Sequence, residues 1–321
     1  MAENQYIYAV ARIRSKEMSL LSLSFMEQLI SAKTYEDCLR LLSDKGWDTE
    51  GKLPEEFLTE EREKTWALMR ELVDDPTVFH VFLYENDFHN LKAAIKQVCT
   101  HGEVPNIYKS NGTIDPNFIY EAVKNNEFMK LPAYMREAGK EAYEVQLKSY
   151  DSQLCDVILD RASLEMTYEA GMKSKSQIFM DYARLKIVAA NIKIAIRSVK
   201  TGKSMEFLKK ALVPSDALNV TALAEACLQG MDAVYDFLET TPYSDAVSAI
   251  QTSASAFEKW CDDKLMDYIK PQRYNPFTIE PLAAYVLARE NEIKCVRIVL
   301  SGKLNDLPEE AIRERLREMY V

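Results

Sequence analysis

The chain has 321 residues, of which 47% are hydrophobic and 28% are charged, so it can fill sizeable cores and remain soluble. Its net charge of −10 argues against nucleic acid as the main partner, because nucleic-acid binding needs a basic surface. Nine glycines are few where an average chain of this length has roughly twenty, which disfavours phosphate-binding loops and tight-turned β folds.

The N-terminal sequence MAENQYIYAVARIRSKE is charged early and lacks the apolar core of a signal peptide, so we expect a cytoplasmic protein. No uncharged run reaches the eighteen or so residues that a membrane helix requires, and we therefore expect no direct membrane span. The six cysteines are far apart and form no C-x-x-C pair, which is typical of buried thiols in a reducing compartment.

Helical patterns begin at once. Apolar residues recur at helical spacing over 6–42, with a break near Ser22–Ser24 where a serine predicts the start of a second helix. The sequence L-P-E-E at 53–56 and 307–310 predicts two helix starts, since proline suits the first turn and glutamates complement the helix dipole. The stripe over 133–168 predicts one long amphipathic helix, or two with a slight break.

Residues 178–199 form the most apolar segment and contain no Gly or Pro over a length that favours a buried helix over a strand. Gly and Pro gather instead in segments that we interpret as joints between modules, namely 102–116, 201–214, 241–242 and 271–281. The predicted fold class is therefore all-α.

An internal repeat organises these helices. ENDFHNLKAAI at 85–95 aligns without gaps with ENEIKCVRIVL at 290–300, and NIKIAIR at 191–197 aligns with NLKAAIK at 90–96. Each copy is followed by a glycine (Gly102, Gly202 and Gly302), which predicts a left-handed helix end. We interpret the chain as three similar helical modules with approximate boundaries 1–112, 113–212 and 213–321.

The sequence TGKS at 201–204 matches the end of a nucleotide-binding P-loop. The first glycine of that motif would fall on Arg197, inside an apolar helical run, so the part that surrounds the phosphates is missing. We therefore interpret TGKS, like SGK at 301–303, as a helix end.

No residue pattern indicates catalysis. His80, His89 and His101 lack metal-ligand spacing, and neither H-E-x-x-H nor G-x-S-x-G occurs. The acidic groups Glu60-Glu61-Glu63 and Asp262-Asp263 are interpreted as solvated faces. We predict no catalytic, cofactor-binding or metal site.

Two sets of basic residues are candidates for partner binding. Arg12 and Arg14 lie on the first predicted helix, where a charged outer face is the simpler interpretation. Lys92, Lys193 and Arg297 occupy matching positions in the three repeats, and they form either repeated ion pairs or a ring of basic side chains around a shared axis.

Three segments carry a family resemblance: YIYAVARIRSKEMSLL, DYARLKIVAANIKIAIRSVKTGK and PFTIEPLAAYVLARENEIKCVRIVLSGKLNDLPEEAIRERL. They resemble the C subunit of prokaryotic rotary V-type (archaeal-type) ATPases, which is similar to the d subunit of the eukaryotic V-ATPase. The resemblance covers nearly the whole chain, except 100–130 and 243–270, which match only in helical character.

The resemblance implies three similar helical bundles around a pseudo-three-fold axis, shaped as a funnel. One mouth would receive the central shaft (the D and F subunits), and the other side would rest on the membrane proteolipid ring. It implies a single copy within a larger hetero-complex, peripheral to the membrane, with no active site and no cofactor. The basic candidates would then lie near the cavity or its rims.

Two other hypotheses belong to different classes: a generic helical scaffold for some other protein, and an enzyme whose site forms only between domains. Co-purification with shaft and ring components distinguishes the adaptor from the scaffold. A nucleotide-binding enzyme should melt at a higher temperature with millimolar ATP, because specific binding stabilises the folded state.

Overall fold

The computed structural model describes residues 6–100, 102, 107–149 and 151–321, and these residues form helices and connecting segments without any strand. The prediction of an all-α fold is confirmed for this part of the chain. His101, Tyr150 of the predicted stripe, and residues 103–106 of the first predicted joint lie outside the described residues. Backbone contacts group the chain into two compact units, whereas the three-module division stays a prediction.

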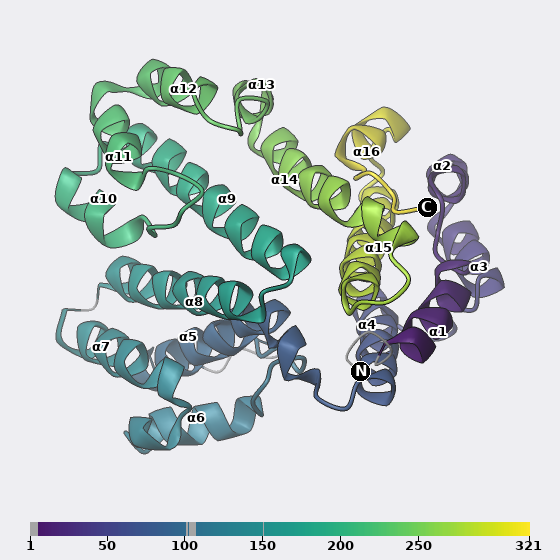
Figure 1. The fold of residues 1–321 in the computed structure, drawn as a ribbon, viewed down its shortest axis with the longest axis horizontal. Coiled ribbons are helices and arrows are strands. Elements are labelled where there is room, and N and C mark those ends of the chain that lie inside the picture. The colour runs from purple at the N-terminus through teal and green to yellow at the C-terminus, as the bar shows by residue number, and fades with distance from the viewer. Residues whose placement is uncertain (1–5, 101, 103–106, 150) are drawn as a thin grey trace. The chain divides into compact units, whose positions relative to one another are not determined.

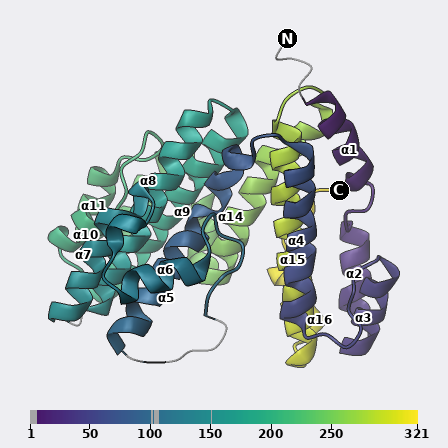
Figure 2. The ribbon, with the colours of Figure 1, turned by 90° about the horizontal axis from the view of Figure 1, so that it is seen from below.

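The first unit joins the two ends of the chain, Met1–Pro76 and Asp245–Val321. Its central element is α15 (Glu280–Leu304), which is buried along most of its length and packs beside α4 (Figure 2). The other helices of the unit are α1 (Ile7–Glu17), α2 (Leu23–Ser31), α3 (Tyr35–Asp44), α4 (Pro54–Leu72), α13 (Ala246–Thr252), α14 (Ala254–Ile269), the 3-10 helix η4 (Lys270–Tyr274) and α16 (Glu309–Arg315). Leu29, Phe57 and Val296 are fully buried members of its core.

The second unit is one continuous stretch, Thr77–Ser244. Within it α8 packs between α7 and α9 and also contacts α5 (Figure 1). The helices are α5 (Tyr84–Thr100), α6 (Pro116–Lys124), α7 (Ala133–Ser149), α8 (Ser152–Ser174), α9 (Gln177–Thr201), α10 (Met205–Ala211), α11 (Val220–Gln229) and α12 (Met231–Glu239), with short 3-10 turns η2 (Pro76–Phe82) and η3 (Phe128–Lys130). The predicted buried helix over 178–199 is confirmed as α9.

Local signals place several helix starts correctly. The Ser22 hydroxyl accepts a hydrogen bond from the Phe25 N–H at 3.3 Å and caps α2, as the break in the pattern predicts. Pro54 is the first residue of α4, and the Glu56 carboxylate accepts from the Leu53 N–H at 2.7 Å. These contacts satisfy backbone N–H groups that have no partner inside the helix.

The stripe over 133–168 forms two helices, so the second of the two predicted alternatives is confirmed and the single long helix is not found. α7 ends at Ser149, and the Asp151 carboxylate caps α8 by accepting from the Leu154 N–H at 2.9 Å. The chain reverses between them, because α7 and α8 pack against each other (Figure 1). The break between the two helices is therefore a reversal of chain direction and not a slight interruption.

Gly202 confirms the interpretation of TGKS as a helix end. It closes α9 with φ +61°, and the next N–H, of Lys203, donates to the Ser198 carbonyl at 3.0 Å. Ser204 then caps α10 by accepting from the Phe207 N–H at 3.3 Å. The sequence that resembles a P-loop is one helix end followed directly by a helix start.

Gly302 has a different role, and the prediction of a helix end there is wrong. α15 continues to Leu304, and the left-handed residue that follows is Asp306, with φ 52°. A Cβ atom at Gly302 would lie 2.5 Å from Cγ1 of Ile312, so glycine allows α16 to pack closely on α15. The helix end at Gly102 stays a prediction, since residue 101 lies outside the described residues.

Gly302→Ala should therefore lower the free energy of unfolding by about 1–3 kcal/mol, because overpacking forces α16 away. The control is Ser301→Ala, the exposed neighbouring position on the same helix. Chemical denaturation of Gly302→Ala, Ile312→Ala and the double variant provides the measurement. The two losses should not add, since removing the Ile312 side chain relieves the clash; additive losses would contradict this close contact.

Candidate functional site

Arg14, predicted as a partner contact, is half-buried and anchors a loop of its own unit. Its guanidinium bonds the Glu17 carboxylate at 2.8 Å. It also donates to the carbonyl oxygens of Gln272 and Asn275 at 2.6 and 2.8 Å. Arg14 therefore fixes the segment 272–277 against α1.

The loop that Arg14 holds exposes two aromatic side chains. Tyr274 is 88% exposed and Phe277 is 54% exposed. On the neighbouring helix Tyr8 is 64% exposed, and its hydroxyl accepts a hydrogen bond from Arg12. Exposed aromatic groups presented on an anchored backbone are typical of protein-binding surfaces.

The other basic candidates occupy helix surfaces. Arg12 pairs with Glu71 at 3.3 Å, and Arg297 pairs with Glu55 at 2.7 Å. Lys92 of α5 pairs with Asp160 of α8 at 2.6 Å. Lys193 is exposed on α9. Exposed pairs of this kind stabilise a fold by roughly 1 kcal/mol or less.

Buried side chains at the aligned repeat positions bind the main chain in the same way. The Asn90 amide donates to the Lys109 carbonyl at 2.9 Å and accepts from its N–H at 2.8 Å. Asn191 makes the same pair of bonds with Val213, at 2.8 and 2.9 Å. Each asparagine therefore provides a hydrogen-bond partner for both the N–H and the carbonyl of one residue in the connecting segment that follows its helix.

In the third repeat the aligned position is Cys295. Burial raises the pKa of its thiol to about 11, while a hydrogen bond from the Arg317 backbone N–H acts in the opposite direction. One turn earlier, Asn86 and Asn291 align and each donates to a downstream carbonyl, that of Asn111 at 3.0 Å and that of Glu318 at 2.8 Å. The sequence comparison aligns these residues but does not predict these contacts.

The aligned acids Asp87 and Glu292 are both fully buried and both accept backbone N–H groups. Asp87 accepts from the Thr113 N–H and hydroxyl at 2.8 and 2.6 Å, and the Tyr134 hydroxyl donates to it at 3.1 Å. Glu292 accepts from the Leu21 N–H at 2.6 Å. Burial raises the pKa of each carboxyl.

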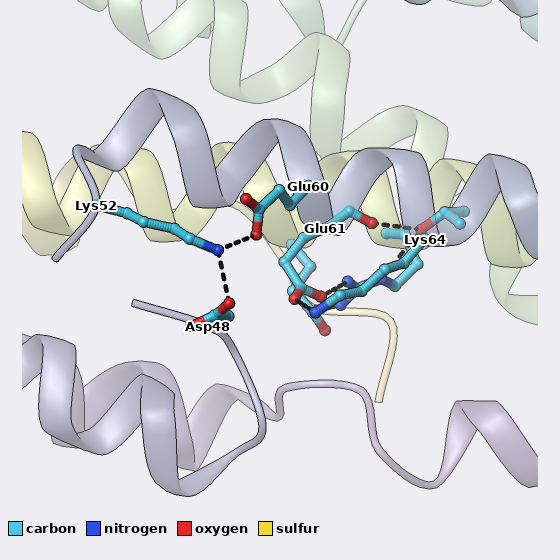
Figure 3. Close-up of polar contacts among 8 residues, drawn as sticks. Asp48, Lys52, Glu60, Glu61 and Lys64 are labelled. Atoms are coloured by element: carbon cyan, nitrogen blue, oxygen red, sulfur yellow. Dashed lines mark hydrogen bonds and ion pairs between the residues drawn. The ribbon is translucent and has the colours of Figure 1, made fainter. Parts of the chain in front are cut away.

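Glu292 belongs to a buried charged network around Arg289. The Arg289 guanidinium bonds Glu292 and also Glu61 of α4, the latter at 2.6 Å, and Lys64 pairs with Glu61 at 2.5 Å. The interpretation of Glu60-Glu61-Glu63 as a solvated face is therefore wrong for Glu61, which is 5% exposed. Glu60 pairs instead with Lys52 at the surface, at 2.7 Å (Figure 3).

These groups form structural contacts within their own units. Within the described ranges no group of three or more His, Cys, Asp or Glu side chains is placed to hold a metal ion. His89 bonds from Nε2 to the Ile107 carbonyl at 2.9 Å, which is a structural contact.

An open depression on the first unit is lined by polar side chains, among them Lys33, Tyr35 and Lys303. The Lys303 ammonium donates to the main chain of α2 and its end.

None of the helices in the described part of the chain is long and apolar enough to span a membrane.

A family model described as "ATP synthase (C/AC39) subunit" matches residues 9–315. The chain is similar to the C subunit of the V-type sodium ATPase of Enterococcus hirae, with 25% identity over 96% of this chain and 97% of that protein. It is also similar to the C subunits of the A-type ATP synthases of Desulfurococcus sp. (23%; 98% and 91% covered) and Methanocaldococcus jannaschii (23%; 97% and 86% covered).

Arg289→Leu should reduce the free energy of unfolding by about 3–5 kcal/mol, because it leaves Glu292 buried without a cation and leaves Glu61 with Lys64 alone. Arg297→Leu, the same change about two turns later on α15, should cost less than about 1 kcal/mol, since its partner Glu55 is exposed. Urea denaturation of both variants measures the difference. Equal losses would show that the buried network does not dominate this helix.

Asp87→Asn should change how stability depends on pH. Burial raises the folded-state pKa of Asp87 above 3.8, with opposing hydrogen bonds from Thr113 and Tyr134. Protonation thus favours the fold, so wild-type stability should increase as the pH falls through the folded-state pKa, and this gain should be complete below about 3.8. In denaturation experiments the stability of the wild type relative to the variant should increase as the pH is lowered through the raised pKa of Asp87. Parallel profiles would contradict this, and Asp232→Asn, an exposed acid of the same unit, is the control.

Proposed function

The chain belongs to the ATP synthase (C/AC39) subunit family, and from this we propose that it is the coupling adaptor of a rotary ATPase. In this role it links the central shaft, formed by the D and F subunits, to the proteolipid ring in the membrane. The family match over residues 9–315 carries the proposal. The family is that of a structural subunit, so ATP chemistry and ion translocation belong to other subunits of the complex.

The repeated main-chain contacts support the three-module part of the proposal. Asn90, Asn191 and Cys295 align in sequence, and each binds the main chain of the segment after its helix. Asn90 and Asn191 each exchange two hydrogen bonds with one residue, whereas Cys295 accepts one. Main-chain contacts at aligned positions are expected when one helical unit has been copied twice. We propose that the modules 1–112, 113–212 and 213–321 surround a socket for the shaft end, in the funnel arrangement that the family resemblance implies.

Stiffness supports the mechanical role. An adaptor that passes torque must not absorb rotation as internal deformation, and low-stability segments deform first. Here the connecting segments at Lys109 and Val213 are tied to buried asparagines by paired hydrogen bonds. Such contacts are directional, so a segment cannot slide along its helix without breaking them.

We propose that the loop 272–277 is one of the contact surfaces. Arg14 fixes its backbone, and Tyr274 and Phe277 project from it into solvent. Arg14 then acts by positioning the loop, whereas Arg12, which is more exposed, can contact a partner directly. Lys92, Lys193 and Arg297 remain a proposed basic ring, because they occupy matching repeat positions.

The proposed complex places one copy of this chain on the cytoplasmic side of the membrane. One similar protein is named as a sodium ATPase component and others as ATP synthase components, so the same adaptor geometry would serve both directions of coupling. Capture of the purified shaft (the D and F subunits) and of the purified proteolipid ring by this chain tests the proposal. Binding of both supports the adaptor; binding of neither would leave a generic helical scaffold.

Tyr274→Ala combined with Phe277→Ala should weaken capture of shaft or ring by at least about tenfold, since aromatic residues at the centre of an interface often contribute about 2 kcal/mol or more each. Met129→Ala, which removes a 72% exposed side chain in the other unit, is the matched control. Binding is measured by biolayer interferometry, with circular dichroism to verify folding. Unchanged affinity for both partners would remove the loop from the proposed interface.

Arg12→Glu should reduce binding in a salt-dependent way, because an exposed charge mainly affects the association rate. Arg40→Glu, another exposed arginine of the same unit, is the control. The association rate is measured for both variants at low and at high salt. Equal effects of the two reversals would indicate a general charge effect and exclude a specific contact at Arg12.

A further inference from the structure

Residues 316–320, which follow α16, have no regular secondary structure but are held almost completely by other elements of the first unit. Leu316, Arg317, Met319 and Tyr320 are between 3% and 8% exposed. We call this segment the closing strap. A buried segment outside helices must find partners for its backbone groups, and the strap finds them on neighbouring helices.

Side chains of α14 hold the first half of the strap. The Lys259 ammonium donates to the Leu316 carbonyl. Asp262 accepts from the Arg317 guanidinium at 2.8 Å, and Asp263 accepts from the Glu318 N–H at 2.7 Å.

Side chains of α15 and α1 hold the rest. The Asn291 amide donates to the Glu318 carbonyl at 2.8 Å, and Cys295 accepts from the Arg317 backbone. The Tyr320 hydroxyl donates to the Glu17 carboxylate at 3.2 Å. The strap therefore bridges three helices that come from opposite ends of the sequence.

We propose that the closing strap is a latch on which the folding of the first unit depends, so that this unit closes last. The second unit is one continuous stretch and can fold as soon as it is synthesised. The first unit needs residues from both sides of the second unit in the sequence, so it cannot be complete before the strap has been synthesised. Until the strap is bound, buried surface of α15 around Cys295 stays open.

The closing strap also contacts the segment 272–277, which is the proposed contact surface. The Arg273 guanidinium lies over the Tyr320 ring, 4.6 Å from its centroid. Glu17 accepts from both Tyr320 and Arg14, and Arg14 holds the loop 272–277. Closure of the strap thus positions the loop, so that only a fully closed subunit presents it; this second step rests on the proposed function.

Buried cysteines provide a direct test in the intact protein. Cys295 lies under the strap in the first unit, whereas Cys155 is buried in the second unit. Asp263→Ala should increase pulsed labelling of Cys295 by N-ethylmaleimide roughly tenfold, since it removes a charge-assisted bond to the strap. Labelling of Cys155, read by peptide mass spectrometry, should not change.

Asp267→Ala is the matched control, because it removes an exposed aspartate one turn later on the same helix. It should leave the labelling of Cys295 at the wild-type rate. If Asp263→Ala also leaves that rate unchanged, or if Cys155 is labelled equally faster, the strap is not a local latch and the proposal fails.

Removing residues 316–321 gives the stronger test. Cys38 and Cys295 of the first unit should become labelled, whereas Cys155 should stay protected because the second unit folds without the strap. Protection of Cys38 would show that the first unit does not need the strap. Exposure of Cys155 would show that the two units fold together, which also overturns the proposal.

A partner assay separates this inference from the proposed function. Tyr320→Ala removes the link to the loop, and it should weaken capture of shaft or ring, as is expected of Tyr274→Ala combined with Phe277→Ala. If the thiol results hold but no variant or wild-type protein binds either partner, the proposed function fails and the latch stands. If the wild type binds and Tyr320→Ala binds equally well, the coupling of latch to loop is wrong.

Discussion

The fold depends on buried polar side chains that satisfy the main chain of irregular segments. A helix satisfies most of its own backbone groups, but a buried irregular segment must find partners in other backbone groups, side chains or water. Asparagine suits this task because its amide both donates and accepts. Asn90 and Asn191 use both groups on a single residue of the following segment. These bonds fix where each connecting segment lies, and the helices that follow take their positions from it.

The sequence predicts local features wherever one residue type has one strong preference. Ser22 and Pro54 mark helix starts, and Gly202 marks a helix end. The reversal between α7 and α8 is not predicted because it contains neither glycine nor proline, and the apolar stripe continues through it. The prediction at Gly302 is wrong because glycine also serves close packing, and only the contact with Ile312 distinguishes the two roles.

Charged residues are the least predictable part of the candidate site. Glu60, Glu61 and Glu63 are chemically alike, yet Glu61 is buried against Arg289 while Glu60 pairs with Lys52 at the surface. Whether a charged side chain is buried depends on tertiary packing. A single sequence does not show which distant residue of opposite charge will lie beside it. Arg14 shows the same difficulty: its charge suggests a partner contact, whereas it binds two carbonyl groups of its own unit.

Buried hydrogen bonds between side chains and the main chain suit a subunit under mechanical load better than apolar packing alone. Dispersion and hydrophobic contacts have no preferred direction, so two apolar surfaces can shift along each other at small cost. A hydrogen bond weakens steeply when its geometry changes, and a buried group that loses its partner costs about 1–3 kcal/mol. In the proposed role, torque would tend to slide the connecting segments along the helices that they contact. Contacts like those of Asn191 with Val213 and Asn291 with Glu318 oppose that shear at their own position, which apolar residues of equal volume would not do.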